Sequence, residues 1–174
     1  MLAAPAAASD GGQIFVNGAG DAKIDLASGF VCPEKIGLFE RDAVGESDAR
    51  SDAAYCAYSA LDGVYGAIVI APLSGPYDPK SALTQDFIEQ EGAGGRKIAE
   101  GVAKFGGAAG VYTRAYETAT VEDAHYRALF AASAVGQWAV QATVEYASPR
   151  DDALERQFLD SVYAEALRQF ALPR

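Results

Sequence analysis

The only imidazole of the chain belongs to His125, and histidine is the side chain that most often serves as a general base near neutral pH. His125 lies in a run that is typical of a β-strand, with no serine or cysteine motif beside it. The GxSxG motif, in which a strained turn exposes a nucleophilic serine, does not occur in the sequence. A small hydrolase that uses His125 is therefore kept only as an alternative function.

The chain has two cysteines, Cys32 and Cys56, and no CxxC motif. An even number of cysteines in an oxidising compartment favours a disulfide. Closing a loop of about 25 residues stabilises a fold by roughly 3.5 kcal/mol in the chain-entropy model. We predict that the two cysteines are bonded, and a pair of buried thiols is the alternative.

Metal ligands are sparse, because one histidine and two paired cysteines cannot complete a tetrahedral zinc site. The segment from Glu40 to Asp52 also carries Asp42, Glu46 and Asp48, and its carboxylates could bind calcium. The ligand spacing and central glycine of an EF-hand are missing there. We interpret the segment as a mobile, solvated loop, and calcium binding stays open.

Nucleotide-binding motifs are missing too. No GxxxxGK[ST] motif occurs, and Gly18-Ala19-Gly20 lacks the third glycine of a dinucleotide-binding loop. We therefore expect no metal and no organic cofactor.

Aromatic and cationic side chains alternate near the C-terminal end of the chain. Tyr, Trp and Arg are the side chains that contribute most to binding at interfaces. Tyr112, Arg114 and Tyr116 share one face of a predicted strand, and His125 and Arg127 share one face of the next. Whether both sets point to the same side depends on the strand register. These five residues are the candidate binding surface, and the alternative is that the tyrosines belong to the core and the arginines are solvated or paired.

Periodicity predicts the elements that carry these residues. Strands are expected over 13–16, 23–26, 53–61, 64–73, 111–118, 124–132 and 137–146, with a hairpin turn at Asp62-Gly63. Helical structure is expected to begin at Asp78-Pro79 and to continue to about residue 105, either as two helical pieces or as one long kinked helix. A second helix is expected after an N-cap at Ser148 with Pro149 at its first position.

Strands, helix, strands and helix follow one another with tight connections between strands. This order predicts the α+β class, with a central antiparallel β-sheet packed against helices. Residues 11–174 are expected to form a single globular domain, because a chain of 174 residues is about the size of one domain.

The first ten residues and the overall charge concern the compartment and the partner. Residues 1–10 include Ala6-Ala7-Ala8, which fits a signal-peptide cleavage site, so we expect a signal-peptide remnant and a periplasmic or secreted protein. A disordered tail is the alternative. A net charge of -10 argues against nucleic acid as a partner. No apolar run is long enough for a transmembrane segment.

Two stretches of the sequence resemble the PsbP-like family. They are Gly29-Phe30-Val31-Cys32-Pro33 followed by Ile36 to Arg41, and Gly136 to Val140 followed by Ser148-Pro149 and an amphipathic helix. In order, the resemblance covers roughly residues 24 to 170. It implies an α/β/α sandwich whose members bind or assist assembly, and it offers no catalytic residue.

The leading hypothesis is a non-catalytic exported domain that binds a protein or envelope component or assists assembly. A small hydrolase that uses His125 or the acidic segment is one alternative. An acidic inhibitor or immunity protein for a basic enzyme is the other.

Overall fold

The computed structural model of the chain describes residues 15–47, 50–60, 63–119 and 125–170. The strands are β1 (Phe15–Asn17), β2 (Lys23–Asp25), β3 (Val31–Cys32), β4 (Lys35–Ile36), β5 (Phe39–Ser47), β6 (Arg50–Ala60), β7 (Val64–Pro72), β8 (Gly95–Phe105), β9 (Ala108–Ala119), β10 (His125–Val135) and β11 (Trp138–Ala147). The helices are α1 (Pro79–Ala82), α2 (Thr84–Gly92) and α3 (Asp152–Phe170).

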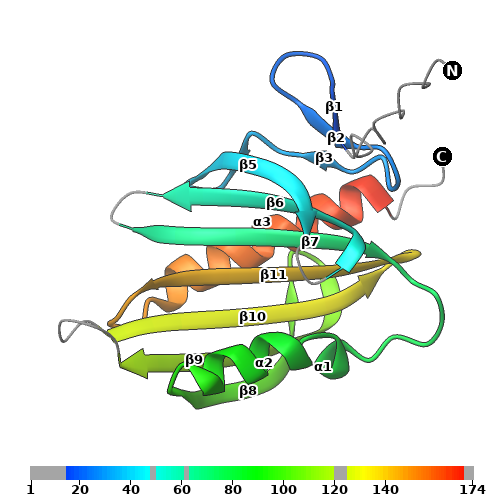
Figure 1. The fold of residues 1–174 in the computed structure, drawn as a ribbon. Helices are drawn as coiled ribbons and strands as arrows, with labels where there is room; N and C mark the ends of the chain where they lie inside the picture. The colour runs from blue at the N-terminus through cyan, green and yellow to red at the C-terminus, as the bar shows by residue number, and fades with distance from the viewer. Residues whose placement is uncertain (1–14, 48–49, 61–62, 120–124, 171–174) are drawn as a thin grey trace, which may run out of the picture.

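An eight-stranded sheet in the order β4-β5-β6-β7-β11-β10-β9-β8 forms the centre of the molecule (Figure 1). Each described strand pair is antiparallel. The sheet consists of two meanders, β4 to β7 and β8 to β11, that join where β7 pairs with β11. A smaller sheet of β1, β2 and β3 lies beside it. The predicted α+β class with a central antiparallel sheet is confirmed at this level, as is the hairpin between β6 and β7.

The long helix α3 covers one face of the large sheet, which we call the α3 face. Phe158, Leu159, Val162 and Tyr163 are buried there, and Phe158 packs on Phe39 with a ring-centroid distance of 4.5 Å. A side chain at Gly66 would place its Cβ 2.6 Å from the Phe158 ring, so only glycine lets the helix approach β7 this closely. The main core therefore lies between α3 and the central strands.

The short helices α1 and α2 lie on the opposite face, which we call the α2 face. Leu83 and Phe87 pack there on Tyr112, Tyr116 and Phe130 of β9 and β10. Asp78 caps α1, because its carboxylate accepts a hydrogen bond from Lys80 N at 3.1 Å, and the predicted helix start is thus confirmed. Neither helix extends over β6 and β7, so that part of the α2 face has no described helix above it (Figure 1).

The predicted continuation of the first helix to residue 105 is wrong. Residues 95–105 form strand β8, which pairs with β9 along most of its length. Ile98 and Phe105 pack against the main core, whereas Val102 is 68% exposed, so these residues do not form one helical stripe. Gly94 supplies the positive φ of +84° at which the chain turns from α2 into the strand. Pairing with β9 has overridden the local helical spacing.

Two smaller predictions also need correction. The acidic segment is not one loop, because most of it belongs to β5 and β6. The N-cap of α3 is Asp151 rather than Ser148: Leu154 N donates to Asp151 Oδ1 at 2.9 Å, and the helix begins at Asp152. The first carboxylate that can reach the free N–H groups of the helix, and not the first proline, sets its start.

Candidate functional site

Arg114, predicted at the binding surface, is buried beneath α2. Its Nε donates to Tyr112 Oη at 3.1 Å and its Nη1 donates to Tyr116 Oη at 3.2 Å. The guanidinium carbon lies 3.9 Å from the centre of the Phe87 ring, a cation–π contact. The arginine is 8% exposed, and both tyrosines are buried as well. These three residues form the floor under α1 and α2.

Glu100 on β8 joins this floor to α1. It accepts a hydrogen bond from Tyr112 Oη at 2.7 Å, and it forms ion pairs with Lys97 at 2.8 Å, Lys80 at 3.1 Å and Arg114 at 3.2 Å. These hydrogen bonds, with Lys97 first, hold the pKa of the Glu100 carboxyl well below its usual range. The cluster fixes α1 to the end of the sheet.

Arg127 lies on the opposite face of the sheet, beneath the start of α3. Its Nη2 donates to Glu155 Oε2 at 3.2 Å and its Nε also donates to that carboxylate. Tyr146 Oη donates to Glu155 Oε1 at 2.6 Å, and Asp151 N donates to Tyr146 Oη at 2.9 Å. The strand register separates the two arginines. Arg114 lies beside Phe130, which packs under α2, whereas Arg127 lies three residues away on the same strand as Phe130 and points to the other face. The two arginines do not share a surface.

His125 is exposed at the start of β10, on the same side as Arg127. Within the described residues, no hydrogen bond joins its imidazole to a hydroxyl or a carboxylate. Its backbone oxygen accepts from Ser148 N at 2.7 Å, which holds the strand end in place. The described geometry therefore gives His125 no activated nucleophile to work with.

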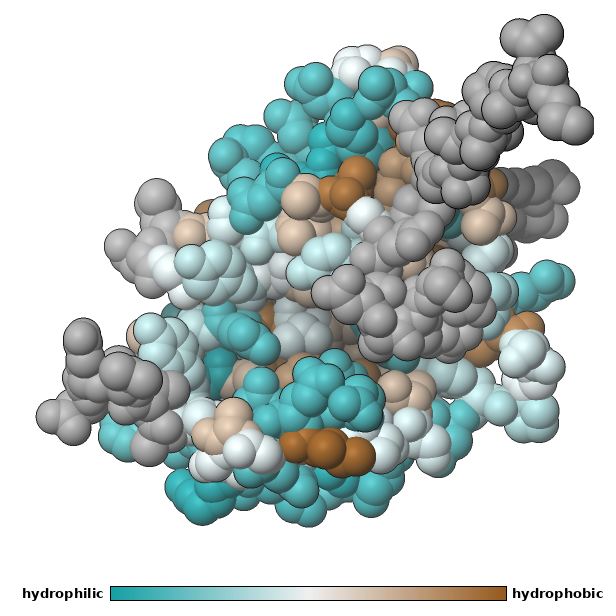
Figure 2. All heavy atoms as spheres, in the orientation of Figure 1, coloured by the Kyte–Doolittle hydropathy of each residue, from teal (hydrophilic) through white to brown (hydrophobic). Residues whose placement is uncertain are grey.

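Part of the α2 face, across β6, β7 and β11, has no described helix above it (Figure 1), and we call it the uncovered sheet face. Its side chains form three cross-strand rows of partners in the register: Tyr55–Val69–Gln141, Ala57–Ala67–Thr143 and Ser59–Tyr65–Glu145. Tyr65 is 58% exposed and the other members are half-buried. Where coloured atoms are visible on this face, Figure 2 shows side chains of mixed hydropathy. The surface thus combines aromatic, aliphatic and polar groups on three paired strands.

Helix α2 forms one wall of the uncovered sheet face. Gln141 Nε2 donates to the carbonyl oxygen of Ala82 at 3.5 Å, which places α1 above β11. One turn further along, burial and then the negative charges of Glu89 and Glu145 raise the pKa of Asp86 to about 6. Burial also raises the pKa of Glu145. Two half-buried carboxyl groups therefore border the face, and Asp86 is partly protonated near neutral pH.

These carboxyl groups could donate or accept hydrogen bonds from a bound molecule. Within the described parts of the chain, no group of three His, Cys, Asp or Glu residues comes close enough to hold a metal ion. The arrangement is suited to recognition at a surface.

Part of the uncovered sheet face was visible in the sequence. The alternation of Gln141, Thr143 and Glu145 with apolar residues marks one polar face of β11. No sequence pattern indicated that Asp86 lies beside this face, because its location depends on how α2 packs against the sheet.

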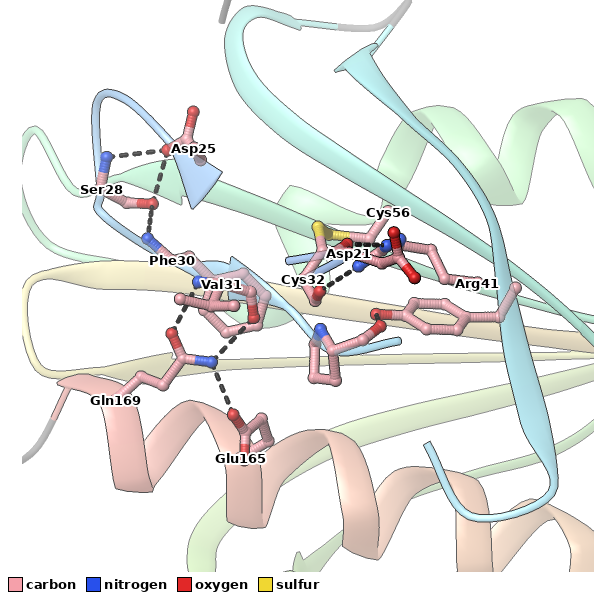
Figure 3. The surroundings of a disulfide bond; sticks show 12 residues. Asp21, Asp25, Ser28, Phe30, Val31, Cys32, Arg41, Cys56, Glu165 and Gln169 are labelled. Carbon is pink, nitrogen blue, oxygen red and sulfur yellow. Dashed lines mark hydrogen bonds between the residues drawn. A yellow bond between two sulfur atoms is a disulfide. The ribbon is translucent and has the colours of Figure 1, made fainter. Parts of the chain in front are cut away.

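The predicted disulfide is present: Cys32 on β3 is bonded to Cys56 on β6, with their Cα atoms 6.1 Å apart. Arg41 Nη1 donates to the Cys32 carbonyl oxygen at 2.6 Å, and its Nη2 donates to Asp21 O. Tyr58 Oη donates to the Pro33 carbonyl oxygen at 3.0 Å. The small sheet is thus tied to the large one covalently and by side chains that reach across (Figure 3).

The side chain of Gln169 holds the small sheet to the end of α3. Its Oε1 accepts from Val31 N at 2.7 Å and its Nε2 donates to Val31 O at 2.8 Å, as a neighbouring strand would (Figure 3). Nε2 also donates to Glu165 Oε1 at 2.7 Å. Strand β3 is therefore held by α3 as well as by the disulfide.

The acids of the predicted loop are divided between strands. Glu40 forms an ion pair with Lys35 at 2.7 Å, and Asp42 accepts a hydrogen bond from Ser59 at 2.9 Å. Asp48 and the side chains of Glu46 and Asp52 lie outside the described residues, and so do residues 1–10, with the expected signal-peptide remnant.

A comparison with protein-family models gives no match, and a comparison with curated proteins finds no similar sequence. None of the described helices is both long and apolar enough to span a membrane.

Proposed function

We propose that the protein is a non-catalytic domain that binds a protein or envelope component, or assists its assembly, through the uncovered sheet face. The observation that carries the proposal is the set of three cross-strand rows on β6, β7 and β11, next to which α2 stops short. Paired strands hold such side chains in fixed positions, so binding costs little ordering entropy.

The composition of the face supports protein recognition. Tyr55 and Tyr65 provide the aromatic area that contributes most at interfaces, and Ala57, Ala67 and Val69 leave a shallow apolar strip between them. Polar groups of β11 and Asp86 of α2 border the strip on one side. An apolar centre with a polar rim is the usual arrangement of a protein-binding surface.

The disulfide supports the proposed compartment. Cys32 and Cys56 are fully buried in the core, and a structural disulfide persists in the periplasm or outside the cell. Together with the alanine-rich residues 1–10, this favours a periplasmic or secreted protein.

The order of elements supports the resemblance to the PsbP-like family. A strand meander, short helices, a second meander and a long final helix place helices on both faces of an antiparallel sheet. We propose that the fold is of the PsbP-like α/β/α type. Fold alone does not specify an activity, so the binding role rests on the uncovered sheet face.

The test is site-specific photo-crosslinking in an envelope extract. A benzoylphenylalanine replaces Tyr65 in one protein and Leu38 in the control, because Leu38 is 68% exposed in the turn between β4 and β5. We expect a discrete adduct from position 65 that excess unlabelled protein suppresses, and none from position 38.

Equal adducts from both positions, or none from position 65, would contradict the proposed binding face. Turnover of an ester or peptide substrate that is lost in His125→Ala would instead favour the hydrolase alternative.

A further inference from the structure

We propose that the outer edge of β8 accepts an extended acidic segment of another protein as an additional strand. This site lies at the end of the sheet, apart from the uncovered sheet face, so the two proposals succeed or fail separately.

The first reason is that β8 is a long strand with one edge that pairs with no described strand. It is the last strand of the large sheet and has 11 residues, whereas the strand at the opposite edge, β4, has two. Every second residue of an edge strand points its N–H and C=O groups away from its neighbour. None of the residues of β8 is buried.

The second reason is the regular pairing of β8 with β9 in the middle of the strand. Register shifts interrupt the pairing of β8 with β9 between Lys97 and Ala99 and between Ala103 and Phe105. Between them, residues 99–103 pair without interruption. A Cβ at Gly101 would meet nothing within 4 Å, so the sheet face at the midpoint of the strand is open to the side chains of a guest. This stretch defines the length over which a guest strand could pair regularly.

The third reason is charge. Strand β8 carries Arg96, Lys97 and Lys104 against a single acid, Glu100, in a protein whose net charge is -10. Lys97 is ion-paired with Glu100, and Arg96 with Glu117 of β9 at 3.4 Å, whereas no acid among the described residues pairs with Lys104. Exposed ion pairs of this kind are weak, so Arg96 and Lys97 can still exchange their partners for the acids of a guest strand. Figure 2 shows mainly hydrophilic side chains along the rim where β8 lies.

Charge also decides between occupants. A second copy would bring another basic β8 against this one, and like charges across a strand pair are destabilising. An acidic segment offers the opposite charges at short range. The distant negative charges of the protein oppose it only weakly, because they are screened over about 8 Å at physiological salt. Exposed Val102 offers an apolar contact on the same edge.

The experiment is an NMR titration of the whole protein with an extended peptide of alternating glutamate and valine. We expect the largest amide shifts at residues 99–103 and none at β4, and we expect a peptide of alternating lysine and valine to have no effect. Sedimentation of the free protein should show a monomer.

A matched pair of variants tests the charge. Within the described residues no acid pairs with Lys104, so Lys104→Glu should weaken the acidic peptide by roughly threefold to tenfold. Lys35→Glu makes the same change on the opposite edge strand and should leave the affinity unchanged.

Several results would overturn the proposal. They are an absence of shifts at millimolar peptide, shifts centred away from β8, equal effects of Lys104→Glu and Lys35→Glu, and a dimer formed through β8. Unchanged thermal unfolding of Lys104→Glu would show that lost binding does not come from lost folding.

Discussion

Arg127 on β10 and Glu155 on α3 form an ion pair that is almost wholly withdrawn from water, with the arginine 2% and the glutamate 6% exposed. The Tyr146 hydroxyl completes the set by donating to the same carboxylate. A buried pair of this kind stabilises little by itself, but each partner is costly to leave alone.

We therefore predict that Arg127→Met destabilises the fold by about 3 to 5 kcal/mol, because it leaves the Glu155 carboxylate buried and unpaired. The double variant Arg127→Met with Glu155→Leu should recover most of that loss. Urea unfolding curves of both proteins measure the difference. A single variant as stable as the parent would show that the pair is solvated.

Arg114 and Arg127 act separately, since their partners lie on opposite faces of the sheet. We predict that Arg114→Ala and Arg127→Ala each destabilise the protein and that their unfolding free energies add within about 0.5 kcal/mol in the double variant. Urea unfolding of the two single variants and the double variant gives the three values. Strong non-additivity would contradict the separation of the two networks.

Asp86 should make stability depend on pH. Its pKa of about 6 in the folded protein lies above the unfolded value, so the folded state binds the proton more tightly. Stability is thus highest below the unfolded pKa and falls as pH rises through about 6. After allowance for solvent screening, Asp86→Asn should add about 1 kcal/mol at pH ~7.5 and almost nothing at pH ~3.5.

The control is Glu34→Gln, which removes a carboxylate from an exposed position between β3 and β4 and should change stability by less than about 0.5 kcal/mol. Thermal melts at both pH values provide the measurement. A gain from Asp86→Asn that does not vary with pH would mean that Asp86 is fully solvated.

Gly106 in the turn between β8 and β9 lies against the backbone of α3. A Cβ there would lie 2.1 Å from Asp160 O and 2.3 Å from Ala164 N, and neither atom can move without displacing the helix. We predict that Gly106→Ala costs more than about 3 kcal/mol. Gly110→Ala shares the positive φ but meets no atom within 4 Å, so it should cost only about 1 kcal/mol. Similar losses in chemical denaturation would contradict the close contact.

The disulfide should stabilise the protein mainly through the unfolded chain. We predict that Cys32→Ser with Cys56→Ser lowers the free energy of unfolding by roughly 3.5 kcal/mol. Titration of the unfolded, unreduced parent should find no free thiol. Two reactive thiols would contradict both the bond and the argument for export.

Sequence patterns predicted the strands that bury at least one face and missed the strand that buries neither. Strand β11 alternates between buried and half-buried residues because α3 lies over one side, and that alternation is legible in the residue types. Strands β9 and β10 are buried on both faces, and their apolar content made them recognisable as strands. Strand β8 has no buried residue, so nothing in its sequence reveals a period of two. The start of α1 was predictable because the Asp78 cap is local.

For the candidate site, residue types were predictable but their sides were not. Arg114 and Arg127 look alike in the sequence, and only the pairing of β9 with β10 places them on opposite faces. Likewise Tyr65 and Glu145 become neighbours through a strand pair that joins the two meanders.

The same strand pair constrains how the chain can fold. Strands β7 and β11 lie side by side in the middle of the sheet, yet the whole second meander separates them along the chain. A chain that emerges from its N-terminus can form β4 to β7 early, but β7 then presents an unpaired edge until β11 arrives. A factor that shields this edge during that interval would suppress aggregation without touching any surface of the finished protein.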